Sequence, residues 1–315
     1  MLLLHVGDTS GESMESWDVV VIGSGIAALR SAIAASDAGA TVAVIESGGP
    51  SNAQSKACST GLAVSVFESD HIHHGKNTSS AGFGLSNSTI VNQRCELALD
   101  NLIELEKWGF NFQRNESGSP SPADSIGHSS PRLCTSGDST GREIIRILEE
   151  QCMKRGIPRK YDLHSISISV ESERVRGLVV LDVQTGVITS IQSKAIILAT
   201  QDHSGLWIDE GGNGLGAALS LRAGAKLRGM EFISWHPLCV PTSNYSLPIS
   251  LLSSGARIRK SNGDDVELTG TMTEASASLL DGDYVLDARN VPISEREWFA
   301  TVSYTHLTLP TICSV

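Results

Sequence analysis

The segment Asp18–Glu46 constrains the fold of this chain more than any other. It opens with the β-branched run Val19–Ile22, which is typical of a strand buried on both faces of a parallel sheet. The small-residue turn Gly23–Ala28 follows, and then a helix with its apolar side chains on one side and Gly39 at its end. Thr41–Ile45 is expected to form a second buried strand. This succession predicts an α/β fold with a Rossmann-like domain built on a parallel sheet.

The turn has the pattern G-x-G-x-x-A, which suits the pyrophosphate of a dinucleotide. Gly23 allows the tight turn, Gly25 lets the backbone approach the phosphates, and the first N–H groups of the helix meet their charge. Glu46 ends the second strand, where its carboxylate would accept hydrogen bonds from a ribose 2′-hydroxyl and would repel the 2′-phosphate of NADP. The residues expected at the pyrophosphate are Gly23, Ser24, Gly25, Ile26, Ala27 and Ala28. The alternative is an ordinary strand–helix–strand unit with a turn of small residues.

Composition argues against several classes of protein. The net charge of −11 disfavours a partner with a phosphate backbone, so we expect no nucleic acid to bind, and the basic run Lys154–Lys160 is expected to be a solvated surface. The 6 cysteines include no C-x-x-C pair, which favours free thiols in a reducing compartment over a zinc ribbon or a disulfide framework. No apolar run approaches the roughly 20 residues of a membrane span, and Met1–Val6 lacks the basic start of a signal peptide. We therefore expect a cytoplasmic protein without a membrane span.

The histidines His71, His73 and His74 suggest a metal site at first sight. No cysteine lies near them and Gly75–Asn77 has the composition of a loop, so histidines in solvent or at a helix edge are the better interpretation. We predict no metal site.

Periodicity places the other elements of the first 237 residues. The expected elements are a helix from Val91 to Leu105, a helix that starts at Thr140 and ends at Gly156, strands at Val175–Val183 and Val187–Ile191 joined by Gln184–Gly186, a separate buried strand at Ala195–Ala199, and a small-residue helix at Gly212–Gly224. The antiparallel strands form a β-meander inserted into the parallel domain.

Several separated segments resemble one family in its own order. They are DVVVIGSGIAALRSA with Glu46, the Ser/Ala/Gly segment Ser55–Ala63, LEKWGFNF, GHSSPR with GDSTGREI, the strand AIILAT, and LRAGAKLRGMEFISWHP. Together they cover roughly residues 17 to 237, which makes chance agreement improbable. The chain thus resembles the flavoprotein subunits of the fumarate reductase and succinate dehydrogenase family, which includes L-aspartate oxidase.

The resemblance implies FAD as the cofactor, with Glu46 on the adenosine ribose. It implies that Ala199 and Thr200 close over the pyrophosphate from the other side. The further residues that it implies along the cofactor are Ser47, Ser55, Lys56, Ala57, Thr60 and Gly61. Some members attach FAD through a histidine in the segment that corresponds to 51–61, and this sequence has none there. We therefore predict non-covalent FAD.

The resemblance also implies residues that contact the substrate. His236 matches the histidine that helps to hold a substrate carboxylate beside the flavin, although a histidine before proline can simply cap or pack. Arg132 is a candidate anion clamp, with a structural ion pair as the alternative. Arg257, where the capping domain is expected to begin, is a further candidate for contact with an anion.

Two departures from the family's pattern stand near the expected cofactor. Gln201 and Asp202 follow the AIILAT strand where glycines are usual, so the Asp202 carboxylate must point away from the phosphates. Leu215 replaces the acid of the family's G-D-G turn.

The expected domains are a disordered leader at 1–16, an FAD-binding domain at 17–237, the incomplete start of a capping domain at 238–300 and a non-native tail at 301–315. The ending SYTHLTLPTICSV resembles translated adapter read-through, so we expect an N-terminal fragment. In the family that the chain resembles, the capping domain supplies an arginine thought to donate the proton, and the chain then returns to complete the isoalloxazine site. The resemblance implies that both of these parts are absent from this fragment.

Two functions of different classes follow. The first is an FAD-dependent oxidoreductase that moves hydride between flavin N5 and a small carboxylate substrate, resembling fumarate, succinate or a related enoate, together with an unknown electron donor or acceptor. The alternative is a non-catalytic, degenerate or truncated FAD-binding module, which Leu215 and Asp202 favour. An NAD-dependent dehydrogenase is a weaker third possibility.

Overall fold

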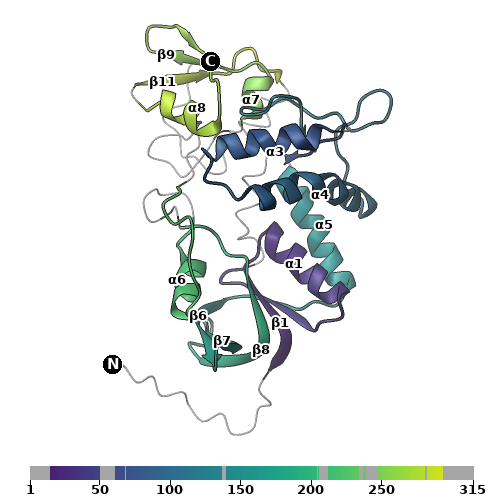
Figure 1. The fold of residues 1–315 in the computed structure, drawn as a ribbon, viewed down its shortest axis with the longest axis vertical. Helices are drawn as coiled ribbons and strands as arrows, with labels where there is room; N and C mark the ends of the chain where they lie inside the picture. Colours follow the sequence, from purple (N-terminus) through teal and green to yellow (C-terminus); the bar gives the residue numbers. More distant parts are fainter. Residues whose placement is uncertain are drawn as a thin grey trace. The chain divides into compact units, whose positions relative to one another are not determined.

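The computed structural model in Figure 1 describes residues 15–49, 61–67, 69–136, 140–203, 205, 212–233, 237–238, 247, 249–280 and 282–293. Contacts within the chain divide these residues between two compact units. The first unit comprises the described residues within Met1–Ser59, Leu105–Phe110 and Ser139–Ile233, and the second comprises those within Thr60–Glu104, Asn111–Asp138 and Ser234–Val315. No helix among the described residues is both long and apolar enough to cross a bilayer.

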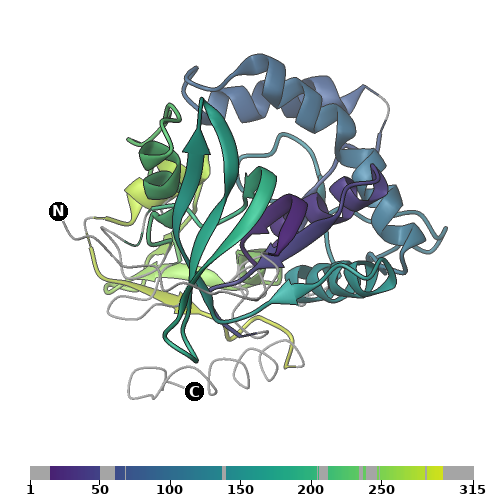
Figure 2. The same ribbon diagram turned by 90° about the horizontal axis from the view of Figure 1, so that it is seen from below.

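A six-stranded sheet organises the first unit, with the strand order β5-β2-β1-β8-β7-β6. The strands are β1 (Ser16–Ile22), β2 (Val42–Ile45), β5 (Arg159–Lys160), β6 (Leu163–Glu171), β7 (Arg174–Asp182) and β8 (Ile188–Leu198). The first four in spatial order are parallel, whereas β7 and β6 continue the sheet as an antiparallel meander. Figure 2 shows the teal strands of the meander beside the purple β1. The mainly parallel α/β fold and its inserted meander are confirmed.

Strand β8 belongs to the parallel sheet and to the meander at once. Its first half pairs antiparallel with β7, from Ile188 to Gln192, and from Gln192 onward it pairs parallel with β1. The prediction of two separate strands was wrong here. Gln192–Lys194 contains neither glycine nor proline, so nothing in the sequence interrupts the extended backbone.

Three helices of the first unit carry apolar faces. They are α1 (Ile26–Asp37), α5 (Thr140–Lys154) and α6 (Leu215–Arg222). Helix α1 buries Ala28, Leu29 and Ile33, and α5 starts at Thr140 as predicted. Leu219 of α6 joins a buried cluster of strand side chains, which consists of Val20, Ile22, Ile45, Leu178, Val180 and Ile191.

The second unit combines helices with two small sheets. Its elements are β3 (Leu62–Ala63), α3 (Asp70–Ala81), most of α4 (Ser88–Lys107), β4 (Leu133–Cys134), α7 (Ser250–Ser253), β9 (Arg257–Lys260), β10 (Asp265–Val266), α8 (Met272–Ser278) and β11 (Tyr284–Asp287). Strands β10, β9 and β11 form one antiparallel sheet, and β3 pairs with β4. Leu238, Ile249 and Ile258 are the buried centre of a cluster on the larger of these sheets.

The histidine-rich segment is part of helix α3, and the expected loop at Gly75–Asn77 is helical. His71 and His73 are exposed, but His74 is buried. The prediction of a loop was wrong because the helix is anchored by tertiary contacts of Asp70, which a local reading of Gly-Lys-Asn does not include.

Candidate functional site

Gly23 lies where three parallel strands end. Its N–H donates to the carbonyl of Ile45 at the end of β2 (3.0 Å), and the Ala199 N–H donates to the carbonyl of Ile22 at the end of β1 (2.9 Å). Gly23 has φ +132°, and a Cβ there would collide with the carbonyl oxygen of Ala199. Because both the backbone angle and the space require glycine, this position brings the ends of β1, β2 and β8 together.

The N-terminus of α1 follows directly. Gly25 is its N-cap residue, no side chain of the described residues caps it, and its first turn holds no acidic residue. Ala28 is fully buried, so its small size permits close packing of the helix. The free N–H groups of a first helical turn are a favourable place for a phosphate, and the predicted turn residues are brought together as that role requires.

Glu46 continues β2 at the same edge of the sheet. Its side chain is 2% exposed, and the guanidinium of Arg159 contacts its Oε1 through both Nε and a terminal nitrogen, each at 2.6 Å. The other terminal nitrogen of Arg159 donates to Glu149 Oε1 on α5 (2.9 Å). Burial disfavours the charge of Arg159, but the charge of Glu46 and the hydrogen bonds to both carboxylates outweigh it, so the pKa of Arg159 is raised. The expectation of a solvated surface at Lys154–Lys160 was therefore wrong for Arg159.

Ala199 and Thr200 follow β8 at the same sheet edge. Gly216 of α6 approaches Thr200 so closely that a Cβ on the glycine would collide with the threonine hydroxyl. The carboxylate of Asp202 accepts a hydrogen bond from the Gly212 N–H (2.9 Å), and its carbonyl accepts one from the Gly214 N–H (3.0 Å). These two hydrogen bonds to Asp202 stabilise the loop before α6.

The remaining predicted cofactor residues are only partly described. Ser47 is exposed beside Glu46. Gly61 belongs to the second unit, where a Cβ would meet the side chains of Leu133 and Thr135 at 2.8 Å each. Ser55, Lys56, Ala57 and Thr60 lie outside the described residues, as does His236.

Arg132 is fully buried in the second unit. It donates through Nε to Asp70 Oδ2 (2.6 Å) and through a terminal nitrogen to Oδ1 (2.7 Å), and Ser130 donates to the same carboxylate (3.0 Å). Hydrogen bonding by Arg132 holds the pKa of Asp70 well below its usual range, against the opposing effect of burial. The structure contains the ion pair that the sequence left as an alternative, and the anion-clamp role of Arg132 stays a prediction.

Two histidines lie near this ion pair. The rings of His74 and His128 are 5.9 Å apart between centroids, and His74 Nδ1 lies 3.4 Å from the hydroxyl of Ser65. Burial, followed by the charge of Arg132, lowers the pKa of both histidines. Both rings therefore favour the neutral form.

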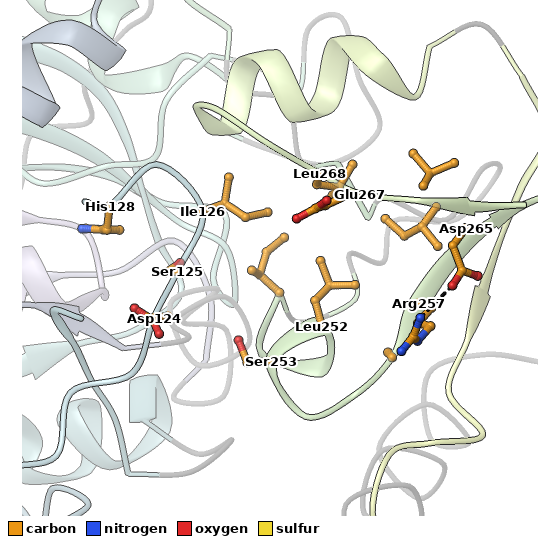
Figure 3. Close-up of a pocket in the computed structure, with 14 residues that line it drawn as sticks. Asp124, Ser125, Ile126, His128, Leu252, Ser253, Arg257, Asp265, Glu267 and Leu268 are labelled. Carbon is orange, nitrogen blue, oxygen red and sulfur yellow. Dashed lines mark hydrogen bonds and ion pairs between the residues drawn. The ribbon is translucent and has the colours of Figure 1, made fainter. Parts of the chain in front are cut away.

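A cavity of about 790 Å³ lies within the second unit, lined partly by Arg257 and His128 (Figure 3). Arg257 is 58% exposed and donates to Asp265 (2.8 Å). The described lining also includes the carboxylates of Asp124 and Glu267, so its acidic side chains outnumber its single arginine. By charge alone this cavity does not favour an anion.

The first unit fits an FAD molecule on three observations. Gly23 has no room for a side chain, no side chain of the described residues caps the N-terminus of α1, and a buried carboxylate lies at the end of β2. Sequence reasoning missed Arg159, Glu149 and Asp70. Arg159 pairs with Glu46 across 113 positions and Asp70 with Arg132 across 62, whereas Glu149 lies 10 positions from Arg159 but on a different element. An arginine in the strand that follows α5 was the only available signal for the contact with Glu46.

Comparisons with known proteins show which proteins the chain is similar to. The chain is 26% identical over 294 residues to a succinate dehydrogenase flavoprotein subunit of Rickettsia felis, covering 89% of this chain and 49% of the relative. It is 29% identical over 248 residues to a fumarate reductase flavoprotein subunit of Proteus vulgaris, covering 76% of this chain and 41% of the relative. The structure of a quinol fumarate reductase from Escherichia coli matches with a TM-score of 0.75 at 26% identity, covering 80% of this chain and 45% of that one.

The chain spans about half the length of the curated relatives that it matches. The relatives confirm the resemblance drawn from the motifs, and they support FAD as the cofactor. The FAD binding domain family matches residues 18–292, which is most of the sequence, and the chain therefore belongs to that family.

Proposed function

We propose that this chain is the FAD-binding part of an oxidoreductase that acts on a small carboxylate. The substrate would be fumarate, succinate or a related enoate. When bound, FAD would supply a hydride acceptor or donor at N5. The names of the relatives, succinate dehydrogenase and fumarate reductase flavoprotein subunits, support this class of reaction.

The observation that carries the proposal is the sheet edge around Gly23. The adjoining strands β1 and β2 end there, at Gly23 with the following N-terminus of α1, and at Glu46. Gly23 and the helix N-terminus would bind the pyrophosphate, and Glu46 would accept hydrogen bonds from the adenosine ribose. Ser47, Ala199 and Thr200 would bind at the same edge.

The predicted substrate residues have distinct chemical roles. His236 would donate a hydrogen bond to a substrate carboxylate and orient the carbon that reacts. Arg132 and Arg257 would attract or steer the anion, although each is already paired with a carboxylate, Asp70 and Asp265 respectively. Because those pairs reduce the net positive charge, His236 is the first residue to test.

The cofactor attachment and cellular setting are part of the same proposal. FAD would be held without a covalent bond, since residues 51–61 include no histidine. We place the protein in the cytoplasm, with an electron donor or acceptor of unspecified kind and with no nucleic-acid partner. The proposal also includes the domain division. It consists of a leader at 1–16, the FAD-binding domain at 17–237, the incomplete start of a capping domain at 238–300 and a non-native tail at 301–315.

A non-catalytic FAD-binding module is the second candidate function. Leu215 at the start of α6 favours it, because a leucine side chain offers no polar group there. Arg257 is also consistent with it, since its ion pair with Asp265 lies in a cavity richer in acids than in bases.

The decisive experiment uses a full-length version of the protein loaded with FAD. Oxidation of a reduced dye by fumarate or a related enoate supports the oxidoreductase, and His236→Ala should then reduce the rate with little effect on bound flavin. Flavin bound without turnover of any such acceptor supports the module. Protein that binds no FAD contradicts both, and flavin that remains with acid-precipitated protein contradicts non-covalent attachment.

A further inference from the structure

Glu46 carries a charge in a place that water barely reaches. Its side chain is 2% exposed, and an isolated carboxylate so buried would be strongly destabilised in its ionised form. A neutral carboxylic acid can donate a hydrogen bond from one oxygen, but it is a weaker acceptor than a carboxylate. Some neighbouring group must therefore keep Glu46 ionised if it is to accept hydrogen bonds from a ribose.

Arg159 is placed to do this. It lies on β5, whose residues pair with β2 immediately before Glu46, with Ile45 opposite Lys160 and Val44 opposite Arg159. Two of its nitrogens lie 2.6 Å from the same oxygen of Glu46, and the arginine side chain is itself only 11% exposed. A short, charge-assisted contact of this kind fixes the direction of the carboxylate as well as its charge.

Two further contacts hold Arg159 itself. Glu149 on α5 accepts from its second terminal nitrogen (2.9 Å), and the guanidinium lies 5.2 Å from the centroid of the Tyr161 ring. The guanidinium is thus held by Glu149 on α5, by Tyr161 directly after β5 and by Glu46 directly after β2. Glu149 and Glu46 together carry one more negative charge than Arg159 neutralises, so the trio repels an additional phosphate.

We propose that Arg159, supported by Glu149, is a positioning residue for the adenosine ribose of FAD, acting through Glu46. This inference rests on the proposed binding of FAD at the Gly23 turn. It adds that the preference for a ribose with a 2′-hydroxyl depends on a side chain from β5. Arg159 would orient the Glu46 carboxylate and would not bind a 2′-phosphate itself.

Equilibrium binding to the protein in its present form tests the proposal. Flavin fluorescence would report FAD, and calorimetry would report ADP, 2′-deoxy-ADP and 2′,5′-ADP. Wild-type protein should prefer ADP over 2′-deoxy-ADP, because only ADP offers the 2′-hydroxyl to Glu46. Arg159→Gln should weaken FAD binding at least about tenfold and remove the preference for ADP, as Glu46→Gln should. The double variant should bind FAD no more weakly than Glu46→Gln alone.

Arg155→Gln is the matched control. Arg155 lies four positions earlier and pairs with Asp37, which is 51% exposed, at 2.6 Å. Its loss should leave FAD affinity and the preference for ADP unchanged, even if the melting temperature falls. If Arg159→Gln does not fold, Arg159→Lys provides the test, because lysine keeps the charge but loses the planar fork and should reduce the preference only in part.

Three results would overturn the inference while leaving FAD binding intact. The first is a folded Arg159 variant that prefers ADP over 2′-deoxy-ADP as strongly as wild-type protein does. The second is a double variant that binds FAD more weakly than Glu46→Gln alone. The third is wild-type protein that binds 2′,5′-ADP more tightly than ADP. Failure of wild-type protein to bind FAD would instead contradict the proposed function on which the inference rests.

Discussion

At the scale of single residues, the fold and the proposed FAD site depend on positions that tolerate no side chain or no change of charge. Gly23 is the strictest of them, because its φ of +132° and its contact with the Ala199 carbonyl both exclude a Cβ. Asp70 and Arg132 form a second such position, since removal of Asp70 would leave the fully buried charge of Arg132 without its partner.

Gly23→Ala is predicted to abolish measurable FAD binding and to destabilise the first unit. The new Cβ would meet backbone atoms, which cannot move aside without shifting the end of β8. A flavin-fluorescence titration and a melting curve would check this. Gly39→Ala is the control: Gly39 has φ +87° but no atom within 4 Å of the new Cβ, so it should cost about 1–2 kcal/mol and leave FAD affinity unchanged. Equal FAD affinities for wild type and Gly23→Ala would contradict the prediction.

Asp70→Asn is predicted to destabilise the second unit by about 3–5 kcal/mol, because the fully buried guanidinium of Arg132 loses its counter-charge. Urea unfolding followed by circular dichroism would measure the difference. Arg289→Gln is the control, since Arg289 is 68% exposed in its pair with Asp287 and its replacement should leave the midpoint unchanged. A shift as small for Asp70→Asn as for the control would show that the buried pair is not stabilising.

Burial also makes the Cys152 thiol unreactive. Its side chain is buried under α1, where desolvation raises its pKa to about 11, so little thiolate forms at neutral pH. We expect iodoacetamide to modify Cys152 only after denaturant is added. Peptide mass spectrometry of protein labelled with and without urea would measure this, and rapid labelling of the native protein would contradict it.

At the scale of elements, strand β8 connects two kinds of sheet. It pairs with β7 in its first half and with β1 in its second, and it ends at Leu198, directly before Ala199 and the expected pyrophosphate site. Gly177 of β7 lies so close to the Ile191 carbonyl that it has no room for a Cβ. The meander therefore supports the strand that precedes Ala199 and Thr200 at the sheet edge around Gly23.

Helix α8 is short, and a capping box stabilises its N-terminus. It has 7 residues, and Thr271 and Glu274 form a capping box in which each side chain accepts from the other residue's backbone N–H. Thr271→Ala is predicted to cost about 1 kcal/mol, while Thr271→Ser should cost little because the hydroxyl is retained. Chemical unfolding of both variants would compare them, and equal losses would show that the hydroxyl is not the stabilising group.

At the scale of the whole molecule, pH is predicted to alter stability through the second unit. His74 and His128 have pKa values below the usual 6.5, so the unfolded chain binds more protons than the folded one when the pH falls below that value. Their contribution to stability is complete above about pH 6.5 and is lost as the pH falls through their folded pKa values. The pKa of Asp70 is also depressed, so its contribution is complete above about pH 4–5 and is lost at still lower pH.

The expected result is a free energy of unfolding that falls in two stages as the protein is acidified. Urea unfolding between pH 8 and pH 3 would measure it. His128→Gln should reduce the first stage and leave the second, because glutamine does not titrate. A free energy that stays constant from pH 8 to pH 5 would contradict the role of the two histidines.

The sequence by itself determined the local parts of this protein. Strand β1, the turn at Gly23, helix α1 and the acid at Glu46 were all predictable, because β-branched runs, glycine positions and helical periodicity act between neighbours in the chain. These same residues predicted a dinucleotide site, and the prediction of FAD came from the resemblance of several further segments, up to roughly residue 237, to the flavoprotein subunits.

Only the tertiary structure decided which charged side chains meet. Arg159 reaches Glu46 across 113 positions of sequence, and Arg132 reaches Asp70 across 62. Neither pairing has a local pattern, since any carboxylate can pair with any arginine that folding brings near it. The continuity of β8 was decided in the same way, because hydrogen bonds from two different neighbours hold a segment whose own sequence only permits an extended strand.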